Sequence, residues 1–252
     1  QGPIKYIGEI IVDCSKSTQF LTAFKLIESY CKSGVISFIA KNLKTSQAYY
    51  QLTLYLINKT KGQSRFITPP DYSSLGYLLA AGLTLGDVHV ENCKNKDIFQ
   101  ADSIFLDLIS QLGGSLSLAD DGLRLKADKD LKAIDVDCGG FPDLVPTLAY
   151  VCSYCQGKSI LRNLEVLTHK ESDRFEEIKK LLSLFEVNYE TQGYDLIIEG
   201  RQHKCKPKIY HPKPDHRMVM VGYLFMRKNN GGTLYEIEHV KKSYRQFFEQ
   251  FS

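Results

Sequence analysis

The sequence lacks three features that would place it in a special class of protein. Its longest nearly apolar stretch, residues 77–85, is only about half as long as a membrane-spanning helix needs to be. Its N-terminus shows no basic region followed by an apolar stretch and a small-residue cleavage site, the pattern of a secretory leader. Charge of one sign is not in excess either, because 32 Lys and Arg stand against 29 Asp and Glu. We therefore expect no membrane segment, and the net charge of +3 does not by itself point to a polyanionic partner.

The composition is otherwise that of an ordinary globular protein. Of the 252 residues, 43% are hydrophobic and 24% are charged, which argues against a disordered, collagenous or coiled-coil chain. The seven cysteines are an odd number and are scattered, which predicts free thiols in a reducing cytoplasm. Cys152 and Cys155 have the spacing of a zinc or redox motif. No second pair follows and the stretch is apolar, so we interpret them as core residues.

A repeated pattern is the most informative feature of the sequence. Each copy opens with an Asp, continues into an apolar helix-like run, and reaches a Gly before a short β-rich stretch. The four copies cover residues 13–34, 71–86, 143–157 and 215–232. Their strands are expected at 35–38, 88–90, 160–164 and 233–237. The opening helices of the last three copies are apolar nearly all round, as buried helices are.

Further elements complete the repeated unit. Amphipathic helices follow two of the strands, at residues 104–112 and 175–185, and turn signals predict hairpins around Gly122 and Gly193. The pattern predicts an α+β fold, an incomplete inside-out α/β barrel of α-β-α-β-β units with buried helices and outward-facing sheets. The polar stretch 59–65 and the missing hairpin before it predict a domain boundary, with domains at 1–68 and 69–252.

Charged and hydroxyl side chains gather at the predicted helix starts. Residues 15–19, 170–174 and 215–217 each have a simple interpretation as helix caps. A repeat, however, brings equivalent helix starts to one end of the fold, and helix N-termini bind anions. Together these starts therefore predict a site for a small polyanionic ligand. Asp143 and Glu171 would supply carboxylates for proton transfer, and the cations for phosphate or carboxylate oxygens would be Lys170, Arg174, Arg217 and Lys242.

Several of these motifs resemble those of the 5-enolpyruvylshikimate-3-phosphate (EPSP) synthases. The specific pair is Lys-Glu-Ser-Asp-Arg at 170–174 with Asp-His-Arg-Met at 215–218. The weaker matches are STQFLTA at 17–23, DYSS at 71–74, Pro-Asp at 142–143 and Lys-Ser-Tyr at 242–244. Their order and spacing agree with the C-terminal part of that family and cover essentially the whole chain.

The resemblance implies an enzyme, a 3-phosphoshikimate 1-carboxyvinyltransferase of the shikimate pathway of aromatic amino acid biosynthesis. The reaction transfers the enolpyruvyl group of phosphoenolpyruvate to the 5-hydroxyl of shikimate 3-phosphate, with no metal or organic cofactor. Asp143, Lys170 and Glu171 are the implied catalytic residues, and Asp143 and Lys170 also bind substrate. The implied shikimate 3-phosphate binders are Ser17, Thr18, Gln19, Ser46 and Tyr49. The implied clamp on phosphoenolpyruvate is Arg174, Arg217 and Lys242.

The chain also departs from the family pattern. Family members have two domains of three units each, whereas four units are visible here, so residues 1–68 correspond to a partial unit of the second domain and 69–252 to most of the other. We expect the lone chain to be inactive unless a complementary N-terminal segment supplies the missing units.

Three alternatives stay open on the sequence alone. One is the related transfer of an enolpyruvyl group to UDP-N-acetylglucosamine, and another is a non-catalytic relative that binds an anion or a partner chain. The third is nucleic-acid binding by the basic stretch 201–213. That stretch is more simply a solvated loop, because few aromatic side chains accompany its lysines. We expect no nucleic-acid partner.

Overall fold

The computed structural model describes residues 7–15, 17–31, 35–43, 47–91, 93, 96–127, 130–200 and 204–251. The chain divides into two compact units, and each is described by itself. Unit 1 comprises residues 1–68 with 99–101, and unit 2 comprises residues 69–98 with 102–252. Among the described residues, the helices are all too short or too polar to cross a membrane.

Unit 1 is a small layer of helices on a two-stranded sheet. Its elements are β1 (Gly8–Asp13), α1 (Gln19–Tyr30), β2 (Ile36–Lys41) and α2 (Gln47–Thr60). The strands pair in parallel, from Gly8 opposite Ile36 to Asp13 opposite Lys41, so α1 is the crossover helix. Five buried side chains form the core, namely Val12, Cys14, Leu21, Ile36 and Phe38.

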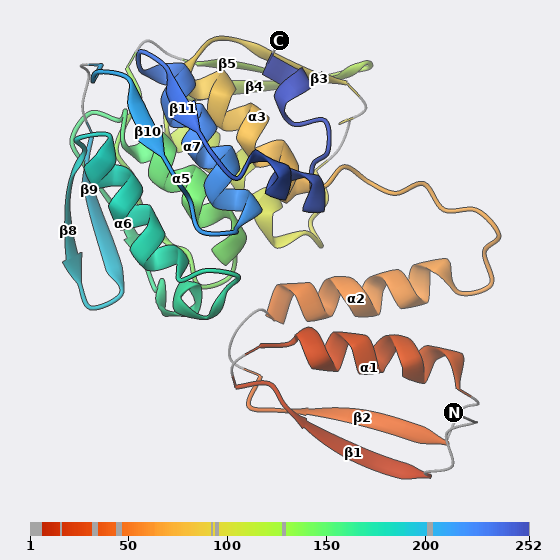
Figure 1. The fold of residues 1–252 in the computed structure, drawn as a ribbon. Helices are drawn as coiled ribbons and strands as arrows, with labels where there is room; N and C mark the ends of the chain where they lie inside the picture. Colours follow the sequence, from red (N-terminus) through yellow and green to blue (C-terminus); the bar gives the residue numbers. More distant parts are fainter. Residues whose placement is uncertain are drawn as a thin grey trace. The chain divides into compact units, whose positions relative to one another are not determined.

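Unit 2 is built around three helices that contact one another (Figure 1): α3 (Tyr72–Thr84), α5 (Val145–Cys152) and α7 (His216–Lys228). Every residue of α5 is buried, as are ten residues each of α3 and α7. Two of the helices begin at an Asp cap, since the side chains of Asp71 and Asp215 accept hydrogen bonds from the N–H groups of Ser73 and Arg217.

The sheets of unit 2 lie outside these helices. One has the order β3-β5-β4, from Val88–Glu91, Gly122–Ala127 and Gly114–Ala119. The second has the order β6-β7-β9-β8, from Asp135–Asp137, Lys158–Arg162, Asp195–Glu199 and Asn188–Gln192. The third pairs β10 (Lys208–Tyr210) with β11 (Gly232–Leu234). The amphipathic helices are α4 (Phe105–Gln111) and α6 (Arg174–Leu184).

Short 3-10 helices connect these elements. They are η1 (Ala101–Ile104), η2 (Pro142–Leu144), η3 (Glu165–His169), η4 (Ile237–Lys242) and η5 (Phe248–Phe251).

The predicted fold class is confirmed, because repeated units place their apolar helices inside and their sheets outside. The sheets formed by the described residues stay separate and do not close into a barrel. Both predicted hairpins form, β4 with β5 and β8 with β9. At the first, Gly122 has φ 153°, and a Cβ there would lie 2.1 Å from the carbonyl oxygen of Val90, so only glycine fits.

Two predicted strands extend too far. The strand predicted at 160–164 is β7, which ends at Arg162 because Asn163 turns the chain with φ 61°. The strand predicted at 233–237 is β11, which ends at Leu234. Glu236 adopts φ 59° and Ile237 begins η4, so an apolar residue that fits a strand pattern belongs to a helical turn instead.

Candidate active site

Four charged side chains of unit 2 meet where η2, α6 and α7 begin. Asp143 lies in η2 at the start of α5, Lys170 follows η3, Arg174 opens α6, and Arg217 is in the first turn of α7. One Asp143 oxygen lies 2.9 Å from Arg174 Nη1 and 3.3 Å from Lys170 Nζ, and the other lies 3.0 Å from Arg217 Nη2. Thus three cations from three segments surround one carboxylate.

A second carboxylate, Asp215, ties the beginnings of α6 and α7 together. Its two oxygens accept from Arg174 Nε at 2.8 Å and Arg174 Nη2 at 3.3 Å, from the Ser172 hydroxyl at 2.9 Å, and from the Arg217 N–H at 2.9 Å. The side chain of Asp215 is fully buried and that of Arg174 is 2% exposed. A buried pair with this many hydrogen bonds fixes the position of Arg174, and through it that of Asp143.

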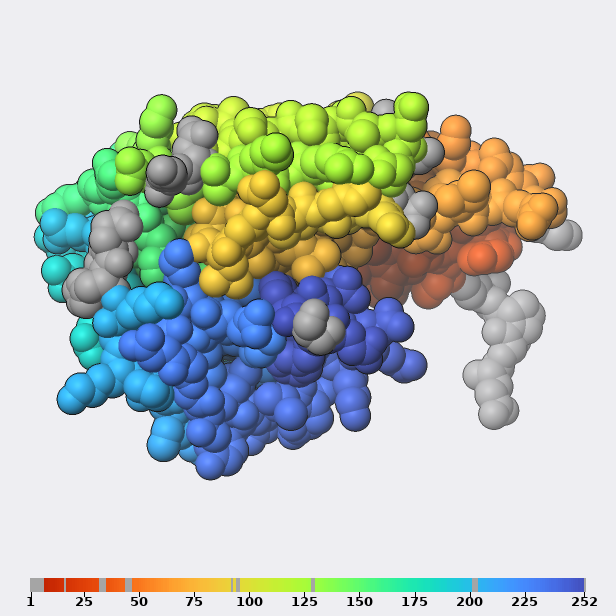
Figure 2. Space-filling view, turned by 90° about the horizontal axis from the view of Figure 1, so that it is seen from above, coloured from red at the N-terminus to blue at the C-terminus, as the bar shows by residue number. Residues whose placement is uncertain are grey.

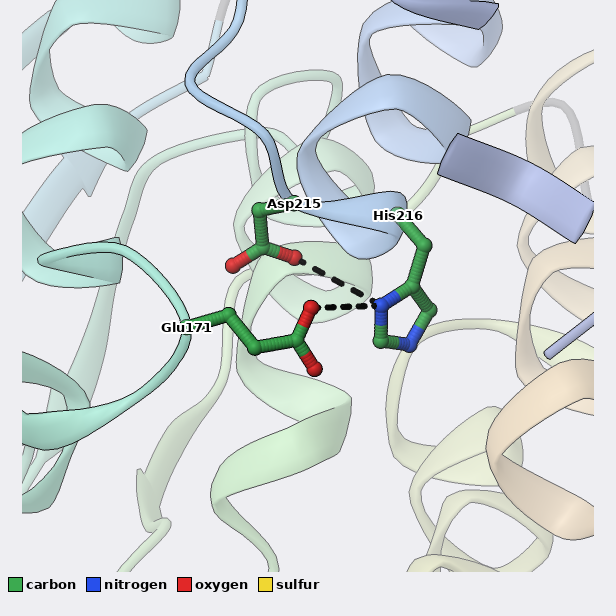
Figure 3. Close-up of side chains that lie close together, drawn as sticks. All are labelled: Glu171, Asp215 and His216. Carbon is green, nitrogen blue, oxygen red and sulfur yellow. Dashed lines mark hydrogen bonds and ion pairs between the residues drawn. The ribbon is translucent and has the colours of Figure 1, made fainter. Parts of the chain in front are cut away.

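Glu171 forms the third part of the cluster (Figure 3). One of its oxygens lies 3.0 Å from His216 Nδ1, and the other accepts from Lys242 Nζ at 2.5 Å. Arg174 Nη2 lies 3.7 Å from Glu171 Oε1, so the Glu171 group and the Asp143 group share a guanidinium. Glu171 is 31% exposed and Lys242 is 60% exposed, which makes this the open side of the cluster.

The cations hold the carboxylates in their ionised form. Burial opposes ionisation of Asp143, but Arg217, Lys170 and Arg174 outweigh it and hold the pKa of this carboxyl well below its usual range. Burial likewise acts to raise the pKa values of Asp215 and Glu171. The hydrogen bonds from Arg174 to Asp215 and from Lys242 to Glu171 act in the opposite direction, and the pKa of both carboxyl groups is lowered. The pKa of His216 is lowered by burial and by the charge of Arg217, despite the nearby Glu171.

A buried acid of η1 lies beside this cluster, against the first turn of α3. Asp102 is 2% exposed and accepts a hydrogen bond from the Ser73 hydroxyl. Burial raises the pKa of Asp102 to about 6, although Ser73 and the charge of Arg217 act in the opposite direction.

Glu171, Asp215 and His216 offer ligand atoms within 4.8 Å of one another, a spacing that suits a metal ion. Both Asp215 oxygens already accept hydrogen bonds, two of them from the buried guanidinium of Arg174. A metal ion on Asp215 would have to displace that cation. The contacts of the described residues therefore favour an ion-pair network here.

The residues predicted to hold shikimate 3-phosphate belong to unit 1. Ser17, Thr18 and Gln19 stand at the start of α1, where the Ser17 hydroxyl accepts from the Gln19 N–H at 3.1 Å and Thr18 is 3% exposed. Tyr49 is half-buried in the first turn of α2. Ser46 lies outside the described residues.

Sequence reasoning missed Ser172 and His216 as members of the cluster and Asp102 beside it, and it treated Asp215 as a cap. The signal for His216 and Asp215 was their place in the motif 215–218. Asp102 carried no local signal, because only the fold brings it beside Ser73.

Other singled-out residues have structural roles. Cys152 and Cys155 are fully buried at the end of α5, where the Cys155 thiol donates to the Val151 carbonyl at 3.4 Å. In the basic stretch, residues 201–203 lie outside the described residues, and Lys208 pairs with Glu186 at 2.6 Å.

Solved structures define the class of fold. An EPSP synthase from Acinetobacter baumannii matches with a TM-score of 0.60 and 22% identity, over 72% of this chain and 45% of that one. The enolpyruvyl transferase NikO from Streptomyces tendae matches with a TM-score of 0.60 and 16% identity, over 86% of this chain and 44% of that one. The chain therefore shares its fold with these two enzymes, over less than half of the length of each.

The family follows from the sequence comparisons. The family model described as EPSP synthase (3-phosphoshikimate 1-carboxyvinyltransferase) matches residues 42–251. The 3-phosphoshikimate 1-carboxyvinyltransferase of Thermococcus kodakarensis is 32% identical over 99% of this chain, and that of Syntrophobacter fumaroxidans is 30% identical over 97%. The chain belongs to the EPSP synthase family. It spans 64% and 62% of the length of these two relatives.

Proposed function

We propose that this chain is part of an enzyme that transfers the enolpyruvyl group of phosphoenolpyruvate to the 5-hydroxyl of shikimate 3-phosphate. The observation that carries the proposal is the network around Asp143, in which one carboxylate is held by Lys170, Arg174 and Arg217. A substrate with a carboxylate and a phosphate needs several cations in one place, and a proton must leave the attacking hydroxyl beside them.

The assigned roles follow the accessibility of each group. Lys242 is 60% exposed, Lys170 22%, Arg217 11% and Arg174 2%. Lys242, Lys170 and Arg217 are thus the cations that meet phosphoenolpyruvate first. Arg174 is buried behind them, where its Nη1 holds Asp143, and it completes the clamp on phosphoenolpyruvate. In unit 1, the start of α1 with Ser17, Thr18 and Gln19 would hold the phosphate of shikimate 3-phosphate, with Ser46 and Tyr49.

The first step forms a bond between the substrate hydroxyl oxygen and C2 of phosphoenolpyruvate, and C3 gains a proton. Asp143 takes the proton of the hydroxyl. Before substrate binds, three cations hold its pKa low and make it a weak base. Substrate anions that engage Lys170 and Arg217 weaken their hold on Asp143, so its basicity rises when substrate is present.

In the second step the bond between C2 and the phosphate oxygen breaks and phosphate leaves with the electron pair, while C3 loses a proton and the double bond between C2 and C3 forms again. Glu171 is the acceptor, since its lowered pKa keeps it ionised and Lys242 and His216 fix its two oxygens. The proton that C3 gains in the first step, and loses again in the second, is relayed to it by Lys170.

We further propose that unit 1 is a partial unit of the enzyme's second domain and unit 2 most of the other domain. A complementary segment would complete the site, and the lone chain would not turn over. All seven cysteines are free, which supports a reducing compartment such as the cytoplasm.

Calorimetric titration of the full chain with shikimate 3-phosphate and phosphoenolpyruvate tests the proposal. We expect Lys170→Ala and Ser17→Ala to weaken binding at least about tenfold, by losing charge-assisted or hydroxyl contacts. The matched control is Lys158→Ala, which removes an exposed pair with Glu190 outside the cluster. Affinities that are unchanged by both Lys170→Ala and Ser17→Ala would exclude the proposed site.

A further inference from the structure

One side of α3 carries two buried oxygens that the ion-pair cluster does not use. The first belongs to the hydroxyl of Tyr77, which is fully buried. The second is Oδ1 of Asp102, whose other oxygen accepts a hydrogen bond from Ser73. Ser73 and Tyr77 stand four residues apart on α3, so both oxygens lie on the same side of that helix. Among the described residues, neither oxygen makes a hydrogen bond of ordinary geometry.

Packing alone requires neither the hydroxyl nor the carboxyl group. The ring of Tyr77 meets that of Phe247 edge to face, with centroids 5.8 Å apart, and a phenyl ring would make the same contact. Figure 2 shows the dark blue C-terminal segment, which carries Phe247, against the golden-yellow segment of α3. A buried oxygen without a partner costs stability, and such oxygens in folded proteins usually have a specific role.

The guanidinium of Arg217 reaches both oxygens from α7, which packs against α3. Burial raises the pKa of Tyr77, and the charge of Arg217 is the strongest influence in the opposite direction. Burial also raises the pKa of Asp102, against the hydrogen bond from Ser73 and then the charge of Arg217. On its other side, Arg217 donates from Nη2 to Asp143 at 3.0 Å. One cation therefore stands between the Asp143 carboxylate and two oxygens beside α3.

We propose that Tyr77 and Asp102 are positioning residues for Arg217, which hold its guanidinium from the side of α3 so that it can meet an anionic substrate. The proposal rests on the proposed function only for the identity of that substrate. When a substrate anion replaces Asp143 as the partner of Arg217, the Tyr77 hydroxyl can accept from the guanidinium and keep its plane fixed. Asp102 adds a negative charge on the same side when it ionises.

The side-chain Nε–H of Arg217 tests the role of Tyr77 in the full chain without any ligand. With ¹⁵N labelling, its resonance is identified by its absence from Arg217→Gln. At about pH 5.5 we expect Tyr77→Phe to speed the exchange of this N–H with water at least about tenfold, because its acceptor is lost. The matched control is Tyr150→Phe, which removes a buried hydroxyl in contact with Thr84 at the other end of α3. It should change the exchange less than about twofold.

The role of Asp102 is tested by a pH titration of the same resonance. The charged groups that act on Asp102 are Asp71 at the cap of α3, Asp143 from η2 and Arg217 from α7. In the native chain the Nε shift of Arg217 should show a step with its midpoint near pH 6, which Asp102→Asn should abolish. His216 titrates beside Arg217 as well, with a lowered pKa, so His216→Gln is the control and should keep the step.

Titration with phosphoenolpyruvate connects this positioning with substrate binding. We expect Tyr77→Phe to raise the Kd for phosphoenolpyruvate at least about threefold, because Arg217 is held less firmly, and Tyr150→Phe to raise it less than about 1.5-fold. Failure of the native chain to bind phosphoenolpyruvate would contradict the proposed function. The measurements on Arg217 need no ligand and would still decide whether Tyr77 and Asp102 position it.

Three results would overturn the proposal. They are exchange of the Arg217 Nε–H at the same rate in Tyr77→Phe and the native chain, equal effects of Tyr77→Phe and Tyr150→Phe on that exchange, and a step near pH 6 that is absent from the native chain or persists in Asp102→Asn. The amide spectrum of each variant verifies that its fold is kept.

Discussion

The two units bury their apolar surface to very different degrees. In unit 2 every residue of α5 is buried, whereas in unit 1 none of the residues of α2 is. Tyr30 of unit 1 is 92% exposed and Phe20 is 69% exposed. A repeat unit buries one of its faces against the next copy. Unit 2 has three copies and unit 1 has one, so the same local pattern produces a large buried core in one unit and a small one in the other.

The charges differ in the same way. Unit 2 holds Asp215 and Arg174 as a fully enclosed pair that joins two helices. The ion pair of Lys25 and Glu28 in unit 1 lies three residues apart within one helix. Burying a charge requires several surrounding segments, and the starts of α6 and α7 in unit 2 provide them for Asp215 and Arg174.

The largest effect that sharpens this comparison is in hydrogen exchange of the full chain. We expect the amides in the middle of α3, α5 and α7 to exchange at least about a thousandfold more slowly than those of α1 and α2, because local opening in unit 1 exposes little additional apolar surface. Mass spectrometry with peptide resolution measures the ratio. Equal protection in the two units would break the comparison.

The next effect is on stability. Arg174→Ala leaves Asp215 buried without its guanidinium, so we expect the free energy of unfolding to fall by about 3–5 kcal/mol. Lys25→Ala in unit 1 should cost less than about 1 kcal/mol. Arg124→Ala, which removes an exposed pair with Asp121, is the control within unit 2. Urea unfolding measures all three, and a loss at Arg174 no larger than that at Arg124 would contradict the network described here.

A third effect depends on pH. The pKa of Asp102 is raised to about 6, so its contribution to stability is present below the unfolded value near 4 and is lost as the pH rises through 6. Asp102→Asn keeps an acceptor for Ser73 and carries no charge. It should therefore gain about 2–3 kcal/mol relative to the native chain between pH 4.5 and pH 8.

The pH dependence of stability has the opposite sign for the carboxylates of the cluster. The lowered pKa of Asp215 means that its contribution is present above the unfolded value and is lost as the pH falls through the folded one.

Asp13→Asn in unit 1 serves as the control for Asp102→Asn and should leave the unfolding of unit 2 unchanged at both pH values. A difference between Asp102→Asn and the native chain that does not change with pH would contradict the burial argument.

The smallest expected effect is that of Lys242→Ala on stability. This side chain is 60% exposed despite its contact with Glu171, so its removal should change the free energy of unfolding by less than about 1 kcal/mol. Thermal unfolding monitored by circular dichroism measures it. A loss of unfolding free energy as large as that of Arg174→Ala would mean that the open side of the cluster contributes as much to stability as the buried pair of Arg174 and Asp215.

Much of the fold could be predicted from the sequence because its signals are local. All-round apolar runs mark α3, α5 and α7, and Gly122 and Gly193 mark the hairpin turns. The ends of β7 and β11 could not be predicted, since they depend on Asn163 and Glu236 in the left-handed region. Asparagine adopts this conformation more often than most residues without being bound to it, and glutamate adopts it rarely.

The candidate site was partly predictable for a related reason. Lys170, Arg174 and Arg217 stand in contiguous motifs, so their charge is visible in the sequence. The partnership of Asp102 with Ser73 joins residues 29 apart and depends on burial, which no local pattern records. The direction of the pKa shifts, too, depends on which charges meet in space.

The most direct test of the central claim is a titration of the isotope-labelled full chain with phosphoenolpyruvate, followed by the amide resonances of residues 170–174 and 215–218. We predict saturable shifts centred on these two segments, and their loss in Arg217→Gln. Shifts that are absent, or that persist unchanged in Arg217→Gln, would contradict the claim that the helix starts of unit 2 form an anion-binding active site.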